Sequence, residues 1–522
     1  MKIRKKASTN SIFQAAGILM VMMMISRVLG FVRDIVLTSN YGLNYETDAY
    51  YAAFAIPDVI YFALVGGALS SSFIPVFSGY LAKEQKEDSD ILASTIINLV
   101  GLGSLFLILI GIIFTPELLG FLVQFEGKTF ELTVFLTRIM FIQCFFMCLT
   151  GIFQGMLQCY KHFTMPAVGA VLYNLSIIVF GCLFTEKLGI TAFTLGVIVG
   201  AILNCVIQIP IMRDFGFHYR PVINLHHPGV KQFFALMVPV LLGLTMSEVN
   251  LLVNQYLGSG LGESILSAMK QAQRIMQLPI GIFGAAIMLS VFPSMASHAA
   301  VGEMDKYKHD LSMGIRTILF ITVPATVGLI VVREPMVRAM YLQAAFTQVY
   351  LDSVTSILFF YCFGIAGYSL QQMLNRGFYA IQDTKTPVRI NVSMLILNIV
   401  LSFILVKPFA EYGLAAAYSI AGLTSMVVLY VFLQKKIGSI GGTAMVKSIV
   451  KSILASILMG VIVYLAVNFT DNAWDLSSKI VQVVQVVLCI GLGVVTYAGA
   501  AVAMKMEEAT MVLGIIKRKL KR

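Results

Sequence analysis

Long apolar stretches recur along the chain at lengths that fit membrane-spanning helices. Residues 91–114 and 480–504 contain no charged side chain, and each stretch exceeds the roughly 20 residues that a helix needs to cross about 30 Å of hydrocarbon. Fourteen such stretches can be recognised, so the pattern predicts an all-α polytopic membrane protein. The predicted spans cover residues 12–38, 49–81, 91–114, 131–158, 165–185, 189–212, 231–257, 264–297, 311–332, 352–380, 388–406, 412–433, 449–468 and 480–504.

The composition supports a membrane environment, and the charge distribution predicts an orientation. Of the 522 residues, 58% are hydrophobic and 12% are charged, whereas soluble domains carry about 25% charged residues. The net charge of +11 does not indicate nucleic-acid binding, because most Lys and Arg residues fall in alternate loops on one side. By the positive-inside rule this side is the cytoplasm, so both termini are predicted to be cytoplasmic and the basic tail 517–522 to contact anionic lipids. The predicted exterior loops hold Lys128, Lys187, Arg333, Arg338, Lys407 and Lys479.

A weak internal repeat divides the chain into two related halves. Pro75 corresponds to Pro293 and Met156 to Met373, at near-constant offsets of 218 and 217 residues, and the second copy then gains four residues, about one helical turn. Each half contains six spans, so the two lobes share one membrane orientation in a pseudo-two-fold arrangement, and the transport pathway is expected at their interface. The predicted parts are an N-lobe (1–215), a cytoplasmic linker (216–230), a C-lobe (231–437) and a region with two further spans and the tail (438–522).

The stretch MISRVLGFVRDIV (residues 24–36) places two arginines and an aspartate in the first span. An arginine near the membrane centre costs about 3 kcal/mol on insertion scales, so Arg27 and Arg33 are not expected to face lipid. Arg27 and Asp34 are seven residues apart and share a helix face with Gly30. The pattern predicts that both arginines line a water-filled cavity, with Asp34 partly neutralising one of them.

The second lobe carries a comparable polar face. Lys270, Gln273 and Arg274 recur at helical spacing in the eighth span, and Glu248 lies in the seventh. One interpretation is that these residues form ion pairs between helices. However, cations outnumber anions within the spans, and guanidinium groups bind phosphate oxygens in bidentate geometry. A phosphorylated or carboxylated substrate is therefore predicted.

The sequence contains no pattern typical of an enzyme. It has no Walker A loop, no catalytic-triad pattern and no metal-ligand cluster, and the three histidines at 218–227 lie in the polar linker, where solvation is expected. No catalytic residue, metal or cofactor is predicted.

Several motifs resemble a known family. The segments SRVLGFVRDIVLTSNYG and TDAYYAAFAIP (within residues 26–57) and FYAIQDTKTPV (378–388), with fourteen spans in a 6+6+2 arrangement, resemble the MurJ/MviN lipid II flippase family of the multidrug/oligosaccharidyl-lipid/polysaccharide exporter superfamily. The resemblance implies a protein of the bacterial cytoplasmic membrane that acts in peptidoglycan biosynthesis. It would move undecaprenyl-pyrophosphate-linked GlcNAc–MurNAc-pentapeptide to the outer leaflet by alternating access, coupled to the membrane potential or to a Na⁺ or H⁺ gradient. Implied partners are lipid II, membrane lipids and the peptidoglycan synthesis machinery.

The resemblance also implies roles for individual residues. This sequence departs from the family pattern at two positions. Tyr61 lies where many relatives carry an arginine, and Gln273 lies where they carry an acidic residue. Lys270 is expected to supply the cation that is missing at Tyr61. The expected substrate-binding residues are Arg27, Arg33, Arg274, Lys270, Tyr61 and Gln273. Gating or structural roles are expected for Ser26, Gly30, Asp34, Asp48 and Glu248, and an ion site for Asn254 and Asn375.

Other functions stay open from the sequence. They are a flippase for another polyprenyl-pyrophosphate-linked glycan, a cation-coupled antiporter of small molecules or drugs, and a non-transporting membrane scaffold. An antiporter of the same superfamily would be expected to have twelve spans and anionic cavity residues, so fourteen spans and several arginines favour the lipid-linked glycan.

Overall fold

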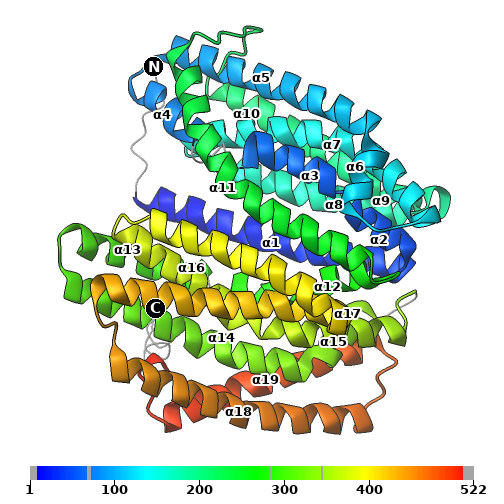
Figure 1. The fold of residues 1–522 in the computed structure, drawn as a ribbon, viewed down its shortest axis with the longest axis vertical. Helices are drawn as coiled ribbons and strands as arrows, with labels where there is room; N and C mark the ends of the chain where they lie inside the picture. Colours follow the sequence, from blue (N-terminus) through cyan, green and yellow to red (C-terminus); the bar gives the residue numbers. More distant parts are fainter. Residues whose placement is uncertain (1–8, 67–71, 282–284, 343–344, 510–522) are drawn as a thin grey trace. The chain divides into compact units, whose positions relative to one another are not determined.

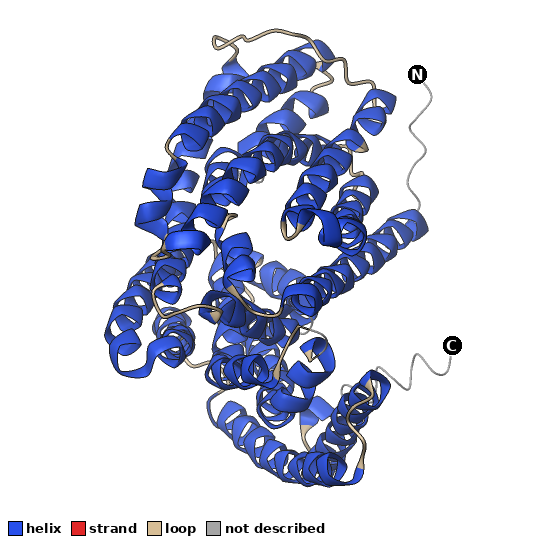
Figure 2. Cartoon of the chain, turned by 90° about the vertical axis from the view of Figure 1, so that its right-hand side faces the viewer, coloured by secondary structure: helices blue, strands red, loops and turns tan. Residues whose placement is uncertain are grey.

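The computed structural model describes residues 9–66, 72–281, 285–342 and 345–509. These residues form helices joined by loops (Figure 2), which confirms the predicted all-α class. Within them, nine helices are long and apolar enough to cross a membrane, or ten spans if the bent pair Gln348–Cys362 and Gly364–Ala380 forms one more. The chain divides into two compact units, Met1–Ser264 and Ile265–Arg522.

The described residues of the first unit form the α-helices labelled in Figure 1, together with a short π-helix at Phe62–Gly66. Its α-helices are α1 (Thr9–Tyr41), α2 (Tyr45–Ala52), α3 (Ala55–Tyr61), α4 (Ile74–Ala82), α5 (Lys86–Ile113), α6 (Thr115–Leu122), α7 (Gly127–Cys159), α8 (Thr164–Leu188), α9 (Thr191–Val206), α10 (Gln208–Asp214) and α11 (Pro228–Ser259).

The second unit carries the remaining helices and ends with a helical hairpin. They are α12 (Ile265–Pro279), α13 (Ala285–Ala300), α14 (Met304–Tyr341), α15 (Gln348–Cys362), α16 (Gly364–Ala380), α17 (Lys385–Ile437), α18 (Gly442–Ala473) and α19 (Lys479–Ala503).

The structure describes two predicted spans in parts. The described residues of the span expected at 49–81 lie in α2, α3, the π-helix and α4, and those of the span expected at 264–297 lie in α12 and α13. Asn44 caps the first of these helices, because its side-chain oxygen accepts hydrogen bonds from the amides of Glu46 and Thr47 at 3.0 and 3.1 Å. An N-cap of this kind satisfies amide groups that have no partner within the helix.

Small residues let helices of the first unit pack closely. A Cβ atom on Gly196 of α9 would lie 2.8 Å from Ile177 Cα, and one on Gly200 would lie 2.8 Å from the Tyr173 carbonyl oxygen. Only glycine permits such a close approach of α9 to α8. α8 also packs along α1, so the close pairing supports the position of the helix that carries the predicted arginines.

Helix α17 folds back on itself. Ala410 has the non-helical angles φ 49° and ψ −130° two residues after Pro408, and it separates two helical halves. A straight helix of 53 residues would be about 80 Å long, yet Asp383 just before α17 pairs with Lys436 near its end, with 2.6 Å between Oδ2 and Nζ. The two halves correspond to the predicted spans 388–406 and 412–433.

The internal repeat has a counterpart in backbone conformation. Glu84 and Gly302 follow α4 and α13 with φ of 60° and 77°, and Lys161 and Gln382 follow α7 and α16 with φ of 59° each. In each pair the next amide donates back to the carbonyl five residues earlier. The second pair is 221 residues apart, which is 382 minus 161 and four more than the upstream offset of 217. The extra turn of the second copy therefore lies towards the end of α16.

The pairing of Asp383 leads to a pH prediction. Burial raises the pKa of Asp383, but hydrogen bonds from Lys436 and Thr386 outweigh this effect and lower the pKa to about 2. Because the pKa of Asp383 is lower in the folded protein, its ionised form stabilises the fold at pH values above 3.8, the ordinary pKa of an aspartate. This contribution is lost as the pH falls towards 2. Asp383→Asn should therefore lower the melting temperature in detergent at pH 7, and the difference from the parent should shrink between pH 4 and pH 2. A difference that stayed constant over this range would contradict the proposed pairing.

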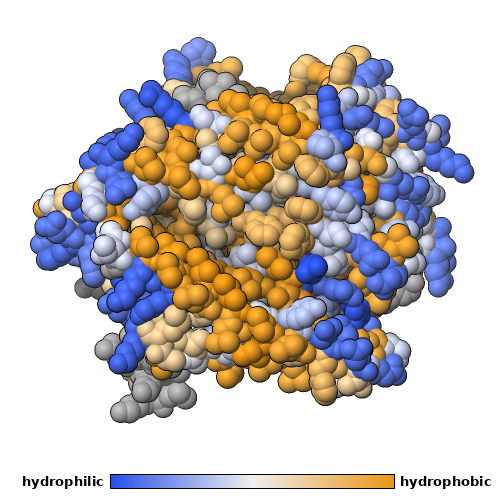
Figure 3. Space-filling view, turned by 60° about the horizontal axis from the view of Figure 1, so that its bottom comes forward, coloured by the Kyte–Doolittle hydropathy of each residue, from blue (hydrophilic) through white to orange (hydrophobic). Residues whose placement is uncertain are grey.

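The C-terminal hairpin presents a largely apolar surface. Figure 3 shows apolar side chains covering broad areas of the surface, with polar side chains gathered towards its edges. Because the hairpin is long enough to span a membrane, these side chains are suited to contact lipid. The exposed apolar residues of α18 and α19 include Val450, Ile457, Leu458, Val461, Leu465, Val483, Val487 and Val494.

Candidate functional site

The charged pair of α1 is held by a partner from α8. Arg33 donates from Nε and Nη2 to Oδ1 of Asp34, both at 3.0 Å, and from Nη1 to Oδ1 of Asn174 at 3.3 Å. Asp34 is buried, and the Arg33 side chain is only 17% exposed. Asp34 therefore neutralises Arg33, as one arginine was predicted to be neutralised, and Asn174 fixes the direction of the guanidinium group.

Ser26 and Gly30 belong to the same contact between α1 and α8. The Asn174 amide donates to the Ala170 carbonyl at 3.1 Å and to Ser26 Oγ at 3.4 Å, and Ser26 Oγ donates to the same carbonyl at 3.4 Å. A Cβ atom on Gly30 would lie 3.8 Å from the Asn174 oxygen. These residues form one polar group between two helices of the first unit.

Arg27 has a different environment from Arg33. It lies on α1 with an exposed side chain, although Asp34 seven residues later is buried. Among the residues that the structure describes, no carboxylate forms an ion pair with the Arg27 guanidinium group. Arg27 and Arg33 therefore differ in environment although both lie on α1.

The predicted residues of the second unit lie together on α12. Lys270, Gln273 and Arg274 are half-buried there, on a strongly amphipathic helix that packs mainly against α15. Both cations keep interactions with their own surroundings. The structure thus places two cationic side chains, Arg27 and Arg33, on α1 of the first unit, and two, Lys270 and Arg274, on α12 of the second.

Asp48 anchors a backbone segment instead of facing solvent. It is fully buried in α2, and its Oδ2 accepts a hydrogen bond from the Ser264 amide at 2.7 Å. Three residues before Asp48, the Tyr45 amide donates to the side chain of Glu263, the residue before Ser264, at 2.9 Å. Tyr61 ends α3, half-buried and edge-on to Phe62, and Glu248 is half-buried on α11.

The two residues expected at an ion site lie in different units. Asn254 in the first unit donates to the Asn250 carbonyl at 2.8 Å, and Asn375 in the second accepts from Asn391 at 3.3 Å. The described residues contain no group of three His, Cys, Asp or Glu side chains that could hold a metal ion. Each asparagine is thus engaged within its own unit.

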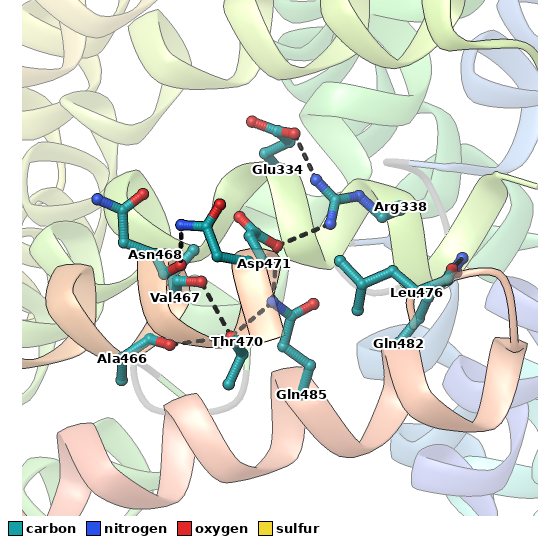
Figure 4. A network of polar contacts seen from close by, with 11 residues as sticks. Glu334, Arg338, Ala466, Val467, Asn468, Thr470, Asp471, Leu476, Gln482 and Gln485 are labelled. Atoms are coloured by element: carbon teal, nitrogen blue, oxygen red, sulfur yellow. Dashed lines mark hydrogen bonds and ion pairs between the residues drawn. The ribbon is translucent and has the colours of Figure 1, made fainter. Parts of the chain in front are cut away.

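A polar network at one end of the C-terminal hairpin was not anticipated from the sequence (Figure 4). Arg338 on α14 pairs with Glu334 and, at 2.9 Å, with Asp471 on α18. Gln485 on α19 donates to the same carboxylate at 2.9 Å, and Lys479 donates to the Arg338 carbonyl at 3.2 Å. α14 extends to Tyr341, so Arg338 is part of a helix and not of an exterior loop. The i, i+4 spacing of Glu334 and Arg338 was the available signal for this extension.

The other end of the hairpin is held in a similar way. Arg316 on α14 donates to Glu508 at 2.6 Å and to Glu507 at 2.7 Å. Ser448 on α18 donates to Glu508 at 2.8 Å, and Lys451 donates to the Met504 carbonyl at 2.6 Å. Charged contacts at both ends therefore attach α18 and α19 to α14.

Comparison with known proteins identifies the family. The family model described as "Lipid II flippase MurJ" matches residues 38–485, which is most of the chain. The chain belongs to the MurJ lipid II flippase family. This is a family of membrane transporters and not of enzymes, as the sequence predicted.

Individual MurJ proteins and solved structures agree with this assignment. The chain is 27% identical over 422 residues to "Lipid II flippase MurJ" of Burkholderia cenocepacia, covering 79% of this chain and 82% of that protein. It is 29% identical over 421 residues to "Probable lipid II flippase MurJ" of Vibrio cholerae, covering 78% and 80%. A solved MurJ in an inward closed conformation superposes with a TM-score of 0.78 at 25% identity, covering 97% of this chain and 99% of that one. A MATE transporter in an inward-facing conformation gives 0.69 at 16% identity, covering 82% and 99%, and shares the fold.

Proposed function

We propose that this protein is a lipid II flippase. It would carry undecaprenyl-pyrophosphate-linked GlcNAc–MurNAc-pentapeptide from the inner to the outer leaflet of the bacterial cytoplasmic membrane by alternating access through a cationic central cavity. The observation that carries the proposal is the MurJ family match over residues 38–485. The relatives' names identify lipid II as their cargo, and we extend that cargo to this chain.

The residues of the two units suit a pyrophosphate. An arginine in a membrane span is costly unless it meets water or an anion, and its planar guanidinium group matches phosphate oxygens. Arg33 is oriented by Asp34 and Asn174, and Arg27 beside it is exposed. With Arg274, Lys270, Gln273 and Tyr61, these residues form the proposed substrate contacts. Their contribution would be electrostatic stabilisation of a charged headgroup that cannot enter hydrocarbon unaided.

We further propose fourteen spans with both termini in the cytoplasm. Ten spans follow from helix length and hydropathy, counting the bent pair as one. The helices α1, α11 and the α12–α13 pair add three, and the second half of α17, beyond Ala410, adds the fourth. Fourteen spans, in two six-helix lobes and a C-terminal pair, support a lipid-linked cargo over the small-molecule antiporter. Transport would be coupled to the membrane potential or to a Na⁺ or H⁺ gradient, with Asn254 and Asn375 as candidate ion ligands.

The proposal is tested by exposure of lipid II on the outer leaflet of cells depleted of their own flippase. The intact protein should restore exposure, and Arg274→Ala at equal membrane level should reduce it by at least about tenfold if the charge binds the pyrophosphate. The matched control is Arg138→Ala, since Arg138 is an exposed arginine on α7 that donates to the Ile112 carbonyl at 3.2 Å. This control should retain activity.

Each outcome separates a part of the proposal. Restoration by both the intact protein and Arg274→Ala would retain the flippase assignment and give Arg274 a structural role. Failure of the intact protein at normal membrane level would reject lipid II as cargo. The same cells supplied with other polyprenyl-pyrophosphate glycans would then test the second candidate.

A further inference from the structure

The segment between α10 and α11 is bound along the side of α5. The Arg220 amide donates to Ser94 Oγ at 3.0 Å, and the Asn98 side chain donates to the Val222 carbonyl at 2.9 Å while accepting from the Tyr219 hydroxyl at 2.6 Å. The Asn224 amide donates to Thr95 at 3.3 Å and the Arg220 side chain to Glu87 at 2.8 Å. We call residues 218–226 the linker strap. The histidines of this polar loop were predicted to be solvated, and His218 and His226 are exposed whereas His227 is buried. In addition, the strap backbone is held by side chains of α5.

The strap is bound to the face of α5 that continues into an exposed apolar surface. Asn98, Leu102, Leu105 and Leu109 are spaced by four, three and four residues, so they lie on one face of the helix. The three leucines are 56%, 46% and 53% exposed, within a helix that is long and apolar enough to span a membrane. Glu87 and Ser94 continue the same face towards the start of α5. The strap covers this polar part of the face, and Ser94 is fully buried.

The outer side of the strap carries three exposed apolar or aromatic residues among the exposed polar residues His218, Arg220 and His226. The Arg220 and Asn224 amides and the Val222 carbonyl point to α5, whereas the alternate residues Tyr219, Ile223 and Leu225 are about half exposed. Such alternation is typical of an extended segment with two different faces. We call Tyr219, Ile223 and Leu225 the apolar row. Exposed basic residues lie beside it at Arg213 and Lys231.

We propose that the linker strap lies at the boundary of the bilayer, with the apolar row among the lipid headgroups and upper acyl chains. Its continuity with the exposed leucines of α5 indicates lipid as the partner, and the flanking basic residues match the level of the lipid phosphates. A tyrosine at this depth keeps its ring in an apolar layer and its hydroxyl bonded to Asn98. The strap thereby shields a polar helix face and fixes one connection between spans to the membrane surface. This inference does not depend on the cargo.

The test uses single-tryptophan variants in vesicles. The chain has one tryptophan, Trp474, so Trp474→Phe gives a background in which Ile223→Trp, Leu225→Trp or Tyr219→Trp is the only fluorophore. Lipids brominated near the headgroup should quench residues 223 and 225 at least about threefold more than a control in water. The control is Val301→Trp, because Val301 is 70% exposed in the turn between α13 and α14, ten residues before the predicted span 311–332.

The outcomes are distinct. Strong quenching by brominated lipid and weak quenching by aqueous iodide at two of the three positions supports the proposal. Quenching by iodide at the level of Val301→Trp would show that the strap is in water and would overturn it. Protection from both quenchers would show that protein covers the apolar row, such as a second copy of the chain, and would also overturn it. Using three positions keeps the test decisive if one variant fails to fold.

Discussion

Replacing Gly367 by leucine is expected to remove the folded protein from detergent extracts of the membrane. Gly367 lies where α16 crosses the second half of α17, and a Cβ atom there would be 2.6 Å from the Gly422 carbonyl carbon and 2.7 Å from the Leu423 amide nitrogen. Backbone atoms cannot move aside as a flexible side chain can, so the two helices must separate. Separating the helices removes the close contact between Gly367 and Gly422 that holds α16 against α17.

A graded series makes this prediction quantitative. Gly367→Ala introduces the same clash with one methyl group, and overpacking by one such group costs about 2 kcal/mol. It should lower the melting temperature, followed by fluorescence-detected size exclusion, by about 5 °C. The matched control is Gly491→Leu on α19, where a Cβ atom would meet nothing within 4 Å. Equal behaviour of the substitutions at 367 and 491 would show that the helix crossing tolerates separation.

Hydrophobic periodicity predicts where these helices occur better than where they begin. The apolar run at 91–114 corresponds to most of α5, because an uninterrupted run has one favourable arrangement in a bilayer. The run at 49–81 is less apolar than α5, and its first helix, α2, begins four residues before the run, after the Asn44 cap. The surroundings of α2 also depend on a distant segment, because the Ser264 amide binds Asp48, 216 residues earlier.

The candidate site shows the same limit. The sequence predicts that Asp34 neutralises an arginine, since the two residues are adjacent in one helix. It gives no indication that Asn174, 141 residues from Arg33, orients the guanidinium group. The network of Arg338 and Asp471 was missed for a related reason, since the partners are 133 residues apart. A single sequence reports periodicity and local spacing, but contacts between distant segments require the fold.

Neutralising Asp34 is expected to impair both folding and transport. Asp34→Asn leaves Arg33 charged in a largely buried position, and removing one partner of a buried ion pair costs about 3 kcal/mol. The melting temperature should fall, and outer-leaflet exposure of lipid II should fall with it. This variant alone cannot separate a structural role from a role in substrate binding, because both predict a loss.

The double variant Arg33→Gln/Asp34→Asn separates the two roles. It removes both charges, so the stability lost in Asp34→Asn should largely return, as expected when coupled residues are replaced together. If Arg33 binds the pyrophosphate, transport should stay at least about tenfold below that of the parent protein, since glutamine supplies no positive charge. If the pair only joins α1 to its surroundings, transport should return together with the melting temperature. Asn174→Leu in the parent provides the matching test of orientation. It keeps the charge of Arg33 but removes the acceptor at 3.3 Å, so transport should fall by a smaller factor than in the double variant.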